Sequence, residues 1–266
     1  MKFTLLFLLI SLLGFSQVDT TKLNIISWNI QNFGRSKSES DSVMKYITSK
    51  VKIFDIVAIQ EVSTSEFGAQ AVAKLDGLLD RTGTSWDYVV SNPTTGPGSE
   101  RYAYLYKKSR VKLKEKPELE KTLQDKLNRE PFKAVFLFKS NEYYLFNLHL
   151  VPTDKNPSLE ATQLSSLGDT YKGKRIVFMG DLNLSQSDPG FNGVKKWSKP
   201  TLIGKKTSLK MKEVSGEKLN MEYDNFFISS NIILVKSGVI NFFLEFKELK
   251  TARKVSDHCP IYCIIK

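Results

Sequence analysis

The order of apolar and amphipathic segments predicts an α/β protein in which β-sheets are covered by helices. Short apolar, β-branched runs recur along the whole chain, as is typical of strands. Segments with apolar residues three and four positions apart lie between these runs, as is typical of helices. The expected strands are residues 23–28, 56–59, 102–106, 134–138, 143–148, 176–179, 226–228 and 260–265.

Three helices are expected between these strands. Apolar residues repeat at helical spacing over residues 43–51 and again over 72–79, and a third helix is expected from Ser158 to Tyr171. Ser63 and Glu66 have the spacing of a capping box, which predicts where the second helix begins.

One domain is expected from Gln17 to the end of the chain. The sequence has 266 residues and is 41% hydrophobic, so it can bury a full core. Residues 92–99, which are rich in Pro and Gly, and the charged residues 112–129 are expected to be loops. Neither has the composition of a linker between domains, and no repeat of fixed period is present.

Residues 1–16 have the features of a signal peptide. Lys2 precedes an apolar run, residues 3–13, that is about half the length a membrane-spanning helix needs. Gly14 and Ser16 are small residues at the places where signal peptidase requires them, so cleavage is expected directly after Ser16. The alternative is a buried first strand. We therefore expect export to the periplasm or beyond the cell, and no stable membrane association.

The charge of the chain favours a polyanionic substrate. The formal net charge is +11, and it stays near +10 without Lys2. Such a charge attracts polyanions over long distances. Individual lysine pairs, such as Lys195-Lys196, are ordinary solvated surface, so this inference rests only on the net charge of the whole chain.

The two cysteines are expected to be free and buried. Cys259 and Cys263 are four positions apart in an apolar run that is typical of a strand. Extended chain places their Cα atoms roughly 13 Å apart, beyond the roughly 7 Å that a disulfide can bridge.

The two histidines of the chain both lie at the ends of expected strands. His149 follows the run 146–148, and His258 lies in Ser256-Asp257-His258-Cys259-Pro260. A single histidine in such a place is usually a hydrogen-bonded core residue. Here both are accompanied by acidic and amide residues at comparable strand ends, namely Asn29, Glu61, Asp181, Asn183 and Asp224.

Carboxylates at these positions need partners. Burying them unpaired is costly, so they require cations, hydrogen-bond donors or a metal ion. Ordinary strand-end turns, in which Asp and Asn are common, are the alternative for each residue taken alone. The combination suits phosphodiester hydrolysis, because oxygen ligands hold hard cations and two histidines transfer protons near neutral pH. A Gly-x-Ser-x-Gly elbow and a clustered Cys/His zinc pattern are both missing from the sequence.

At these residues the chain resembles the endonuclease/exonuclease/phosphatase superfamily. The matching segments, in chain order, are Ser27-Trp28-Asn29-Ile30, Ile59-Gln60-Glu61-Val62, His149 with Pro152, Gly180-Asp181-Leu182-Asn183, Tyr223-Asp224 and Ser256-Asp257-His258-Cys259-Pro260. Any one of these motifs is weak, but six in order across most of the chain are specific.

Further segments resemble the deoxyribonuclease I branch of that superfamily. Residues 88–91 leading to Glu100-Arg101-Tyr102 look like a strand pair of this branch, and Arg129-Glu130-Pro131 resembles its phosphate-contacting motif. The Pro-Ala-Trp-x-Asp-Arg motif of inositol phosphatases is missing. The resemblance implies a four-layer sandwich, with two packed mixed β-sheets flanked by helices and the active site at one edge.

The resemblance also implies roles for individual residues. His149 would be the general acid paired with Glu100, and His258 the general base paired with Asp224. The metal ligands would be Glu61, Asn29 and Asp257. Asp181 and Asn183 would hold metal or the scissile phosphate. The phosphate contacts would be Arg129, Thr207 and Ser208.

The expected reaction is hydrolysis of DNA to 5′-phosphate and 3′-hydroxyl ends with Mg²⁺ or Mn²⁺, by a monomer without an obligate protein partner. Ser63 and Gly98 stand near positions where the pancreatic-type enzymes carry groove-contacting Arg and Tyr, which weakens the case for groove reading. The cysteine-bearing calcium loop is missing, so structural Ca²⁺ is not predicted. The alternatives are a secreted phosphoesterase acting on a lipid or inositol phosphate, and a catalytically silent polyanion-binding protein.

Overall fold

Two β-sheets packed face to face form the centre of the molecule. The computed structural model describes residues 19–266, so the expected signal peptide lies outside the described residues. One sheet has the order β14 (Leu234–Val239), β15 (Ile261–Ile265), β1 (Leu23–Phe33), β2 (Ile56–Val62), β4 (Arg101–Lys107), β3 (Trp86–Val90). The other has the order β10 (Ser198–Pro200), β13 (Asp224–Ser229), β9 (Arg175–Asp181), β8 (Asn141–His149), β7 (Phe132–Phe138), β5 (Lys112–Leu113), with β6 (Glu118–Leu119) also paired to β7.

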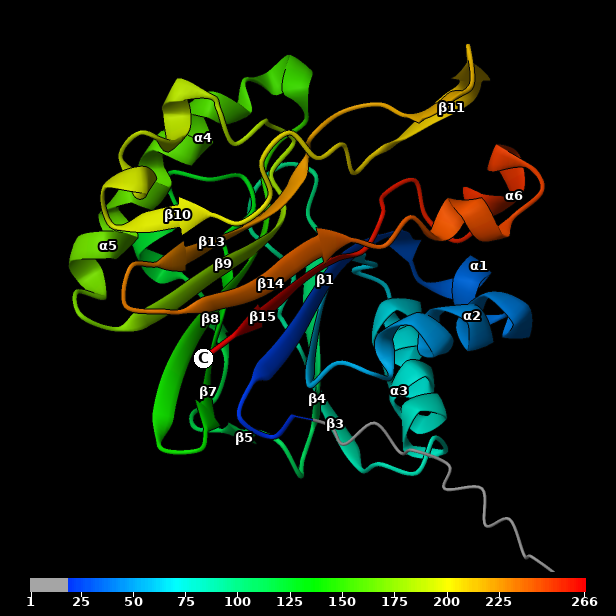
Figure 1. The fold of residues 1–266 in the computed structure, drawn as a ribbon, viewed down its shortest axis with the longest axis horizontal. Coiled ribbons are helices and arrows are strands. Elements are labelled where there is room, and N and C mark those ends of the chain that lie inside the picture. Colours follow the sequence, from blue (N-terminus) through cyan, green and yellow to red (C-terminus); the bar gives the residue numbers. More distant parts are fainter. Residues whose placement is uncertain (1–18) are drawn as a thin grey trace, which may run out of the picture.

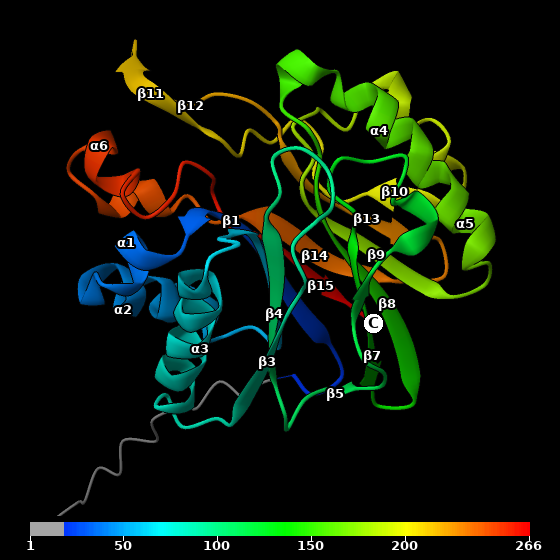
Figure 2. The ribbon, with the colours of Figure 1, turned by 180° about the vertical axis from the view of Figure 1, so that it is seen from behind.

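Helices cover the outer face of each sheet (Figures 1 and 2). On the first sheet lie α1 (Arg35–Ser38), α2 (Asp41–Val51), α3 (Glu66–Asp80) and α6 (Leu249–Ala252). On the second lie α4 (Pro157–Gln163) and α5 (Leu167–Thr170). A separate hairpin, β11 (Leu209–Val214) with β12 (Glu217–Leu219), projects from the body. The prediction of a four-layer sandwich is confirmed.

The aromatic residues of both sheets fill the space between them. Tyr104 of β4 lies 5.5 Å from Phe132 and 5.7 Å from Phe136, both of β7, between ring centroids. Each of these side chains is almost fully buried. Cys259 and Cys263 are also buried and free, as the sequence predicts. This packing fixes the two sheets relative to one another, and with them the residues at their common edge.

Three local predictions were wrong in detail. The helix over 66–80 has Ser65 at its N-cap, and the Ser63 hydroxyl accepts from the Ser65 backbone N–H, so Ser63 and Glu66 form no capping box in the described chain. The helix expected over 158–171 is interrupted by a 3₁₀ turn at Leu164–Ser166. The loop expected over 112–129 contains β5, β6 and a short 3₁₀ turn, because its residues extend the second sheet beside β7.

Two parallel strand pairs bring the candidate residues to one edge. β1 pairs in parallel with β2, and β8 with β9. The C-terminal ends of parallel strands lie at the same edge of a sheet, so Asn29, Glu61, His149 and Asp181 meet there. In the second pair, His149 and Asp181 are opposite one another in register.

Gly180 makes this close pairing possible, and its substitution should be costly. Its φ is +143°, and a Cβ atom there would lie 1.9 Å from the Leu148 carbonyl oxygen. Gly180→Ala is therefore expected to lower the free energy of unfolding by about 3 kcal/mol or more, measured by urea denaturation. Gly77→Ala in α3 is the matched control: a Cβ there meets nothing within 4 Å, so it should stabilise by about 0.5–1 kcal/mol. Equal stability of the two variants would contradict this account.

Candidate active site

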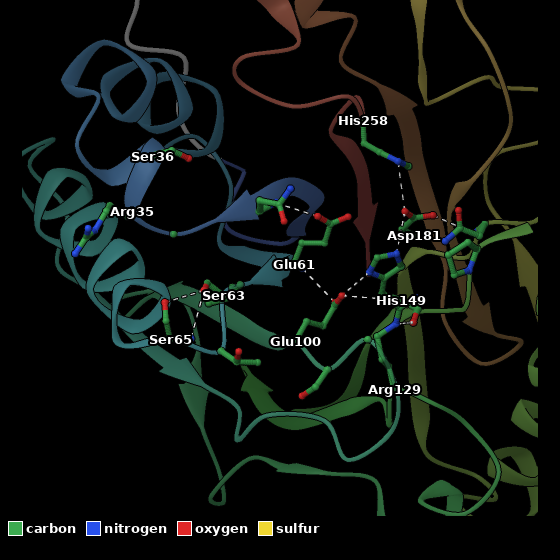
Figure 3. Close-up of a pocket in the computed structure, with 18 of the residues that line it drawn as sticks. Arg35, Ser36, Glu61, Ser63, Ser65, Glu100, Arg129, His149, Asp181 and His258 are labelled. Atoms are coloured by element: carbon green, nitrogen blue, oxygen red, sulfur yellow. Dashed lines mark hydrogen bonds and ion pairs between the residues drawn. The ribbon is translucent and has the colours of Figure 1, made fainter. Parts of the chain in front are cut away.

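A cleft of about 860 Å³ opens at the edge where these strands end. Its inner part is lined by Glu61, Glu100, His149, Asp181 and His258 (Figure 3). These residues come from β2, β9, the end of β8 and the segments that precede β4 and β15. The edge therefore collects polar groups that are as far apart in the chain as residues 61 and 258.

Each histidine is paired with its own carboxylate. His149 Nδ1 lies 2.8 Å from Glu100 Oε2, and His258 Nδ1 lies 2.7 Å from Asp224 Oδ2. All four side chains are nearly fully buried. A carboxylate on Nδ1 fixes the orientation of the ring and leaves Nε2 to face the cleft.

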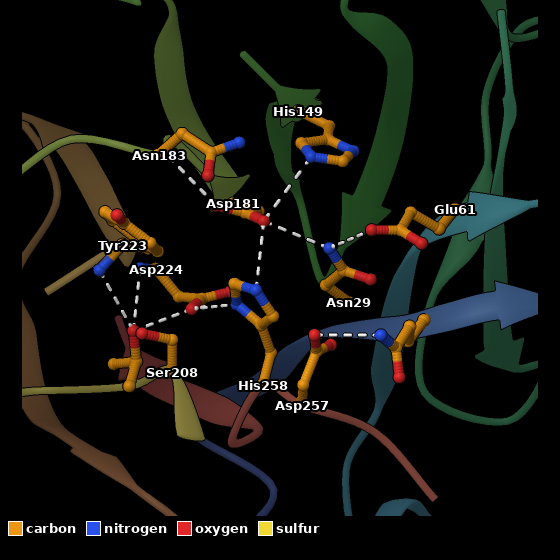
Figure 4. A network of polar contacts seen from close by, with 12 residues as sticks. Asn29, Glu61, His149, Asp181, Asn183, Ser208, Tyr223, Asp224, Asp257 and His258 are labelled. Carbon is orange, nitrogen blue, oxygen red and sulfur yellow. Dashed lines mark hydrogen bonds and ion pairs between the residues drawn. The ribbon is translucent and has the colours of Figure 1, made fainter. Parts of the chain in front are cut away.

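Asp181 stands between the two histidines (Figure 4). Its Oδ2 lies 3.4 Å from His149 Nε2 and 3.4 Å from His258 Nε2. The same oxygen accepts from Asn29 Nδ2 at 3.0 Å, and Oδ1 accepts from the Asn183 backbone N–H at 2.9 Å. Both imidazoles therefore present Nε2 to one small volume around Asp181, where one ring can take a proton from water and the other can give one to a departing oxygen.

The surrounding carboxylates raise the pKa of both histidines. Burial alone would lower the pKa of His149, but Glu100 and Asp181 outweigh burial and raise it. Burial also opposes protonation of His258, yet Asp181 and Asp224 raise its pKa well above the ordinary value. In both rings the neighbouring carboxylates therefore favour the protonated imidazole.

The pKa values of the two buried aspartates, Asp181 and Asp224, shift in opposite directions. For Asp181, burial favours the neutral form, but His258, His149 and the Asn183 N–H outweigh it and lower the pKa. For Asp224, burial and the charge of Asp181 together raise the pKa. The neighbouring histidines therefore stabilise the charged form of Asp181, at the centre of the site.

Titration of the two histidines tests this electrostatic picture. In metal-free protein, both imidazoles should titrate with midpoints above the ordinary value of 6.5, followed by ¹H–¹⁵N NMR. The folded state then binds more protons than the unfolded state. This stabilisation is complete below about pH 6.5 and is lost as pH rises through the raised pKa values. Midpoints at or below 6.5 would contradict the assignment.

Glu61 and Asn29 form the best candidate for a metal site. Asn29 Nδ2 donates to Glu61 Oε1 at 2.8 Å, and the Asn32 backbone N–H donates to Glu61 Oε2 at 2.9 Å. Asn29 Oδ1 is buried and has no hydrogen-bond partner within residues 19–266. A buried carbonyl oxygen without a donor is costly, and a hard divalent cation takes such oxygens together with carboxylates. The residues present therefore fit a divalent metal.

A second group of potential ligands consists of Asp181, Asp224 and His258, whose ligand atoms lie within 4.8 Å of one another. His258 Nδ1 already bonds to Asp224, so this group is better suited to proton transfer than to holding an ion. Asp257, the third predicted metal ligand, accepts from Gln31 Nε2 at 2.8 Å and lies 3.5 Å from Arg253 Nη2.

Arg129 lines the cleft, but its guanidinium is largely engaged by the backbone. Its Nε donates to the His149 carbonyl at 2.9 Å and its Nη2 to the Leu150 carbonyl at 2.5 Å, while Nη1 lies 3.4 Å from Glu100 Oε2. Only the Nη1 side remains for a phosphate. A bidentate grip on phosphate, as the sequence predicts, would require these backbone bonds to break.

Two of the predicted phosphate contacts, Thr207 and Ser208, are not among the residues that line the cleft. Thr207 is fully buried, and its hydroxyl donates to Asp224 Oδ2 at 2.6 Å. Ser208 is 5% exposed, and its hydroxyl accepts from the Met221 backbone N–H at 3.0 Å. As placed, Thr207 positions the partner of His258 instead of touching substrate. Asn183 does line the cleft, and its Nδ2 donates to the Leu150 carbonyl.

Two residues close to the site were assigned no role from the sequence. The Tyr223 ring stacks beside His258 with centroids 6.3 Å apart, and its hydroxyl bonds to Thr153 Oγ1 at 3.0 Å. Lys37 is buried and donates to the Lys254 and Val255 carbonyls, next to the segment that carries Asp257 and His258. Burial lowers the pKa of Lys37 to about 8, against the charges of Asp257 and Glu61. The position of Tyr223 directly before Asp224 was an available signal, but Lys37 had none.

Comparison with known proteins identifies the family. The model of the endonuclease/exonuclease/phosphatase family matches residues 26–258, which include every residue of the inner cleft. The chain belongs to this family. Within the family, the curated relatives place the chain in the deoxyribonuclease I-like branch. The family and these relatives also identify it as a hydrolytic enzyme that acts on phosphate esters.

The match to this chain extends over most of the length of each curated relative. The chain is 27% identical to a deoxyribonuclease of Thioalkalivibrio sp. over 92% of this chain and 71% of that protein. It is 27% identical to mouse deoxyribonuclease gamma over 91% and 84%, and 27% identical to bovine deoxyribonuclease-1 over 96% and 95%.

Solved structures share the fold at lower identity. Mannosyl-6-phosphatase Bt3783 of Bacteroides thetaiotaomicron superposes with a TM-score of 0.68 at 16% identity, covering 92% of this chain and 99% of that one. TDP2 of D. rerio, complexed with a single strand DNA product, gives a TM-score of 0.63 at 19% identity, with the same coverage. No helix within residues 19–266 is long and apolar enough to cross a membrane.

Proposed function

We propose that this endonuclease/exonuclease/phosphatase family member is an exported, divalent-metal-dependent endonuclease that hydrolyses DNA to 5′-phosphate and 3′-hydroxyl ends. The observation that carries the proposal is the pair of His–carboxylate dyads facing each other across Asp181, with both Nε2 atoms 3.4 Å from the same oxygen. The curated relatives named as deoxyribonucleases and the net charge of +11 favour DNA as the substrate.

The two histidines perform the proton transfers. His258 Nε2 takes a proton from water, whose oxygen attacks phosphorus, and the bond from phosphorus to the 3′ oxygen breaks. His149 Nε2 gives its proton to that departing oxygen. The raised pKa of His149 suits the acid. The raised pKa of His258 means that this base works only after losing its proton, so the rate should rise with pH.

The remaining residues orient the reacting groups. Glu100 and Asp224 fix the imidazole rings through Nδ1, and Thr207 fixes Asp224 in turn. Asn183, and Arg129 through Nη1, face the cleft where the scissile phosphate would lie. A divalent ion held by Glu61 and Asn29, Mg²⁺ or Mn²⁺ by their oxygen chemistry, would offset the charge that develops on the non-bridging oxygens.

The protein is proposed to be exported as a single domain. Cleavage between Ser16 and Gln17 would release one catalytic domain, residues 17–266, to the periplasm or the medium as a monomer. Mass spectrometry of the secreted protein tests this: a mature N-terminus at Gln17 is expected, and retention of residues 1–16 on the folded protein would contradict export.

Nicking of supercoiled plasmid by the mature protein with Mg²⁺ tests the proposed reaction. Relaxed and then linear DNA is expected, with ends that DNA ligase reseals because they carry 5′-phosphate and 3′-hydroxyl groups. Sphingomyelin and inositol phosphates, assayed in parallel, should remain intact. Unchanged plasmid together with hydrolysis of either of these compounds would reject the nuclease and favour the lipid or inositol phosphate alternative.

A further inference from the structure

The cleft continues beyond the catalytic groups, toward α1 and the start of α3. This outer part is lined mainly by the small residues Ser36, Ser63, Ser65, Gly98 and Ser99, together with the longer Arg35 and Glu39. Figure 3 shows Arg35, Ser36, Ser63 and Ser65 grouped on the side away from His149 and Asp181. Because most of these side chains are small, they leave the space in front of them open.

The size of the cleft exceeds what a phosphate group requires. Its volume of about 860 Å³ falls within the roughly 300–1,000 Å³ of pockets that enclose a whole organic ligand. The catalytic side chains account for one end only. The outer part therefore has room for the sugar and base of a nucleotide attached to the scissile phosphate.

A nucleotide within a double helix would not fill this space. Its base is paired and stacked inside the duplex and must be extruded before it can enter a pocket. In an unpaired strand, the base is free to turn out from the backbone, and recognition of such strands rests on stacking and on contacts to exposed base edges.

Arg35 offers a face on which a base can stack. Its guanidinium carbon lies 3.7 Å from the centroid of the Phe67 ring, so the group is supported on one side by an aromatic surface. Its other contact is an exposed ion pair at 3.8 Å with Glu39, which screening by water keeps weak. Bases stack on arginine planes irrespective of sequence, and the nearby serine hydroxyls can donate to or accept from any base edge.

The floor of the outer cleft is preformed. A Cβ atom at Gly34 would lie 3.0 Å from Ser63 Cβ, so the turn after β1 and the loop after β2 are in close contact. Ser63 and Ser65 are joined by a hydrogen bond of 2.9 Å between their hydroxyls. Little conformational freedom would be lost when a ligand enters.

We infer that the outer cleft between Arg35, Ser63 and Gly98 is a subsite for an unpaired nucleotide next to the scissile phosphate, so that single-stranded DNA is a preferred substrate. The inference rests on the proposed nuclease activity and adds the class of DNA on which the enzyme acts. It also predicts little dependence on base sequence.

Initial rates on three substrates test the inference. They are a labelled single-stranded oligonucleotide, the same strand annealed to its complement, and bis(p-nitrophenyl) phosphate, which has no base. The natural protein should have a kcat/KM for the single strand at least equal to that for the duplex. Ser63→Leu, which fills the outer cleft, should lower kcat/KM on the single strand about tenfold more than on bis(p-nitrophenyl) phosphate. Arg35→Ala should raise KM on the single strand with a smaller change in kcat.

Ser49→Leu, on the exposed face of α2, is the matched control and should leave all three rates unchanged. A protein whose kcat/KM for the single strand is lower than that for the duplex would overturn the subsite and leave the proposed nuclease intact. An equal loss on all substrates in folded Ser63→Leu would also overturn it. A protein that cuts neither form of DNA would reject the proposed function itself.

Discussion

Replacing either His149 or His258 with alanine is expected to reduce plasmid nicking by about 10²–10⁴-fold, because each variant removes one of the two proton transfers. Each Nε2 faces Asp181 at 3.4 Å, and within residues 19–266 no other imidazole is available to substitute for it. The loss should appear mainly in kcat, since neither ring supplies the principal charge that binds DNA.

Substitution of the carboxylates that pair with the two histidines should have a smaller effect than substitution of the histidines themselves. Glu100→Gln and Asp224→Asn keep the shape of the side chain but weaken the hold on Nδ1, so smaller losses are expected than from removing the ring. Glu245→Gln is the control, because Glu245 forms an ion pair with Lys50 remote from the cleft. It should change the rate by less than about twofold. A folded histidine variant that retains more than a tenth of the activity would exclude that histidine as acid or base.

Removal of divalent metal is expected to abolish nicking, and Mg²⁺ or Mn²⁺ should restore it. The physical reason is that the inner cleft is rich in carboxylates, and the buried Asn29 Oδ1 has no partner within the described chain. Glu61→Gln should weaken metal binding by more than about tenfold, since it removes the charged ligand.

Calorimetric titration with Mn²⁺ measures this binding independently of catalysis. Glu39→Gln is the matched control: Glu39 also lines the cleft, at its outer end, and is not expected to hold the ion. Full activity in excess EDTA would contradict metal dependence. Unchanged Mn²⁺ affinity in Glu61→Gln would move the site to another set of residues, of which Asp181, Asp224 and His258 are the nearest alternative.

The strands and the candidate residues at their ends were predictable because both are local properties of the sequence. An apolar run that ends in Asp, Asn or His marks a buried strand and the polar edge where it stops. All eight expected strands are present, most of them longer than predicted, and β1 extends to Phe33. The short strands β5, β6, β10 and β12 were not predicted, since segments of two or three residues carry little periodicity. The strands β11 and β14, of six residues each, were not predicted either.

The contacts between side chains were not predictable from periodicity, because sheet register and packing decide them. Asp181 lies between the two histidines because β8 and β9 pair in parallel with His149 opposite Asp181, and because the loop before β15 brings His258 across from the other sheet. The same packing turns Thr207 inward to Asp224 and commits two donors of Arg129 to backbone carbonyls. In these orientations Thr207 positions Asp224, and Arg129 keeps only its Nη1 side for a phosphate.

By itself, the sequence determined which groups are available for chemistry, namely two histidines and a set of carboxylates and amides at strand ends, and the type of fold that carries them. Only the tertiary structure decided how these groups pair, which oxygen lacks a donor, and how much open space lies beside them. The reason is that hydrogen bonds and cavities depend on positions within a few tenths of an ångström. Such positions result from the packing of both sheets and their helices, to which residues distant in the chain contribute equally.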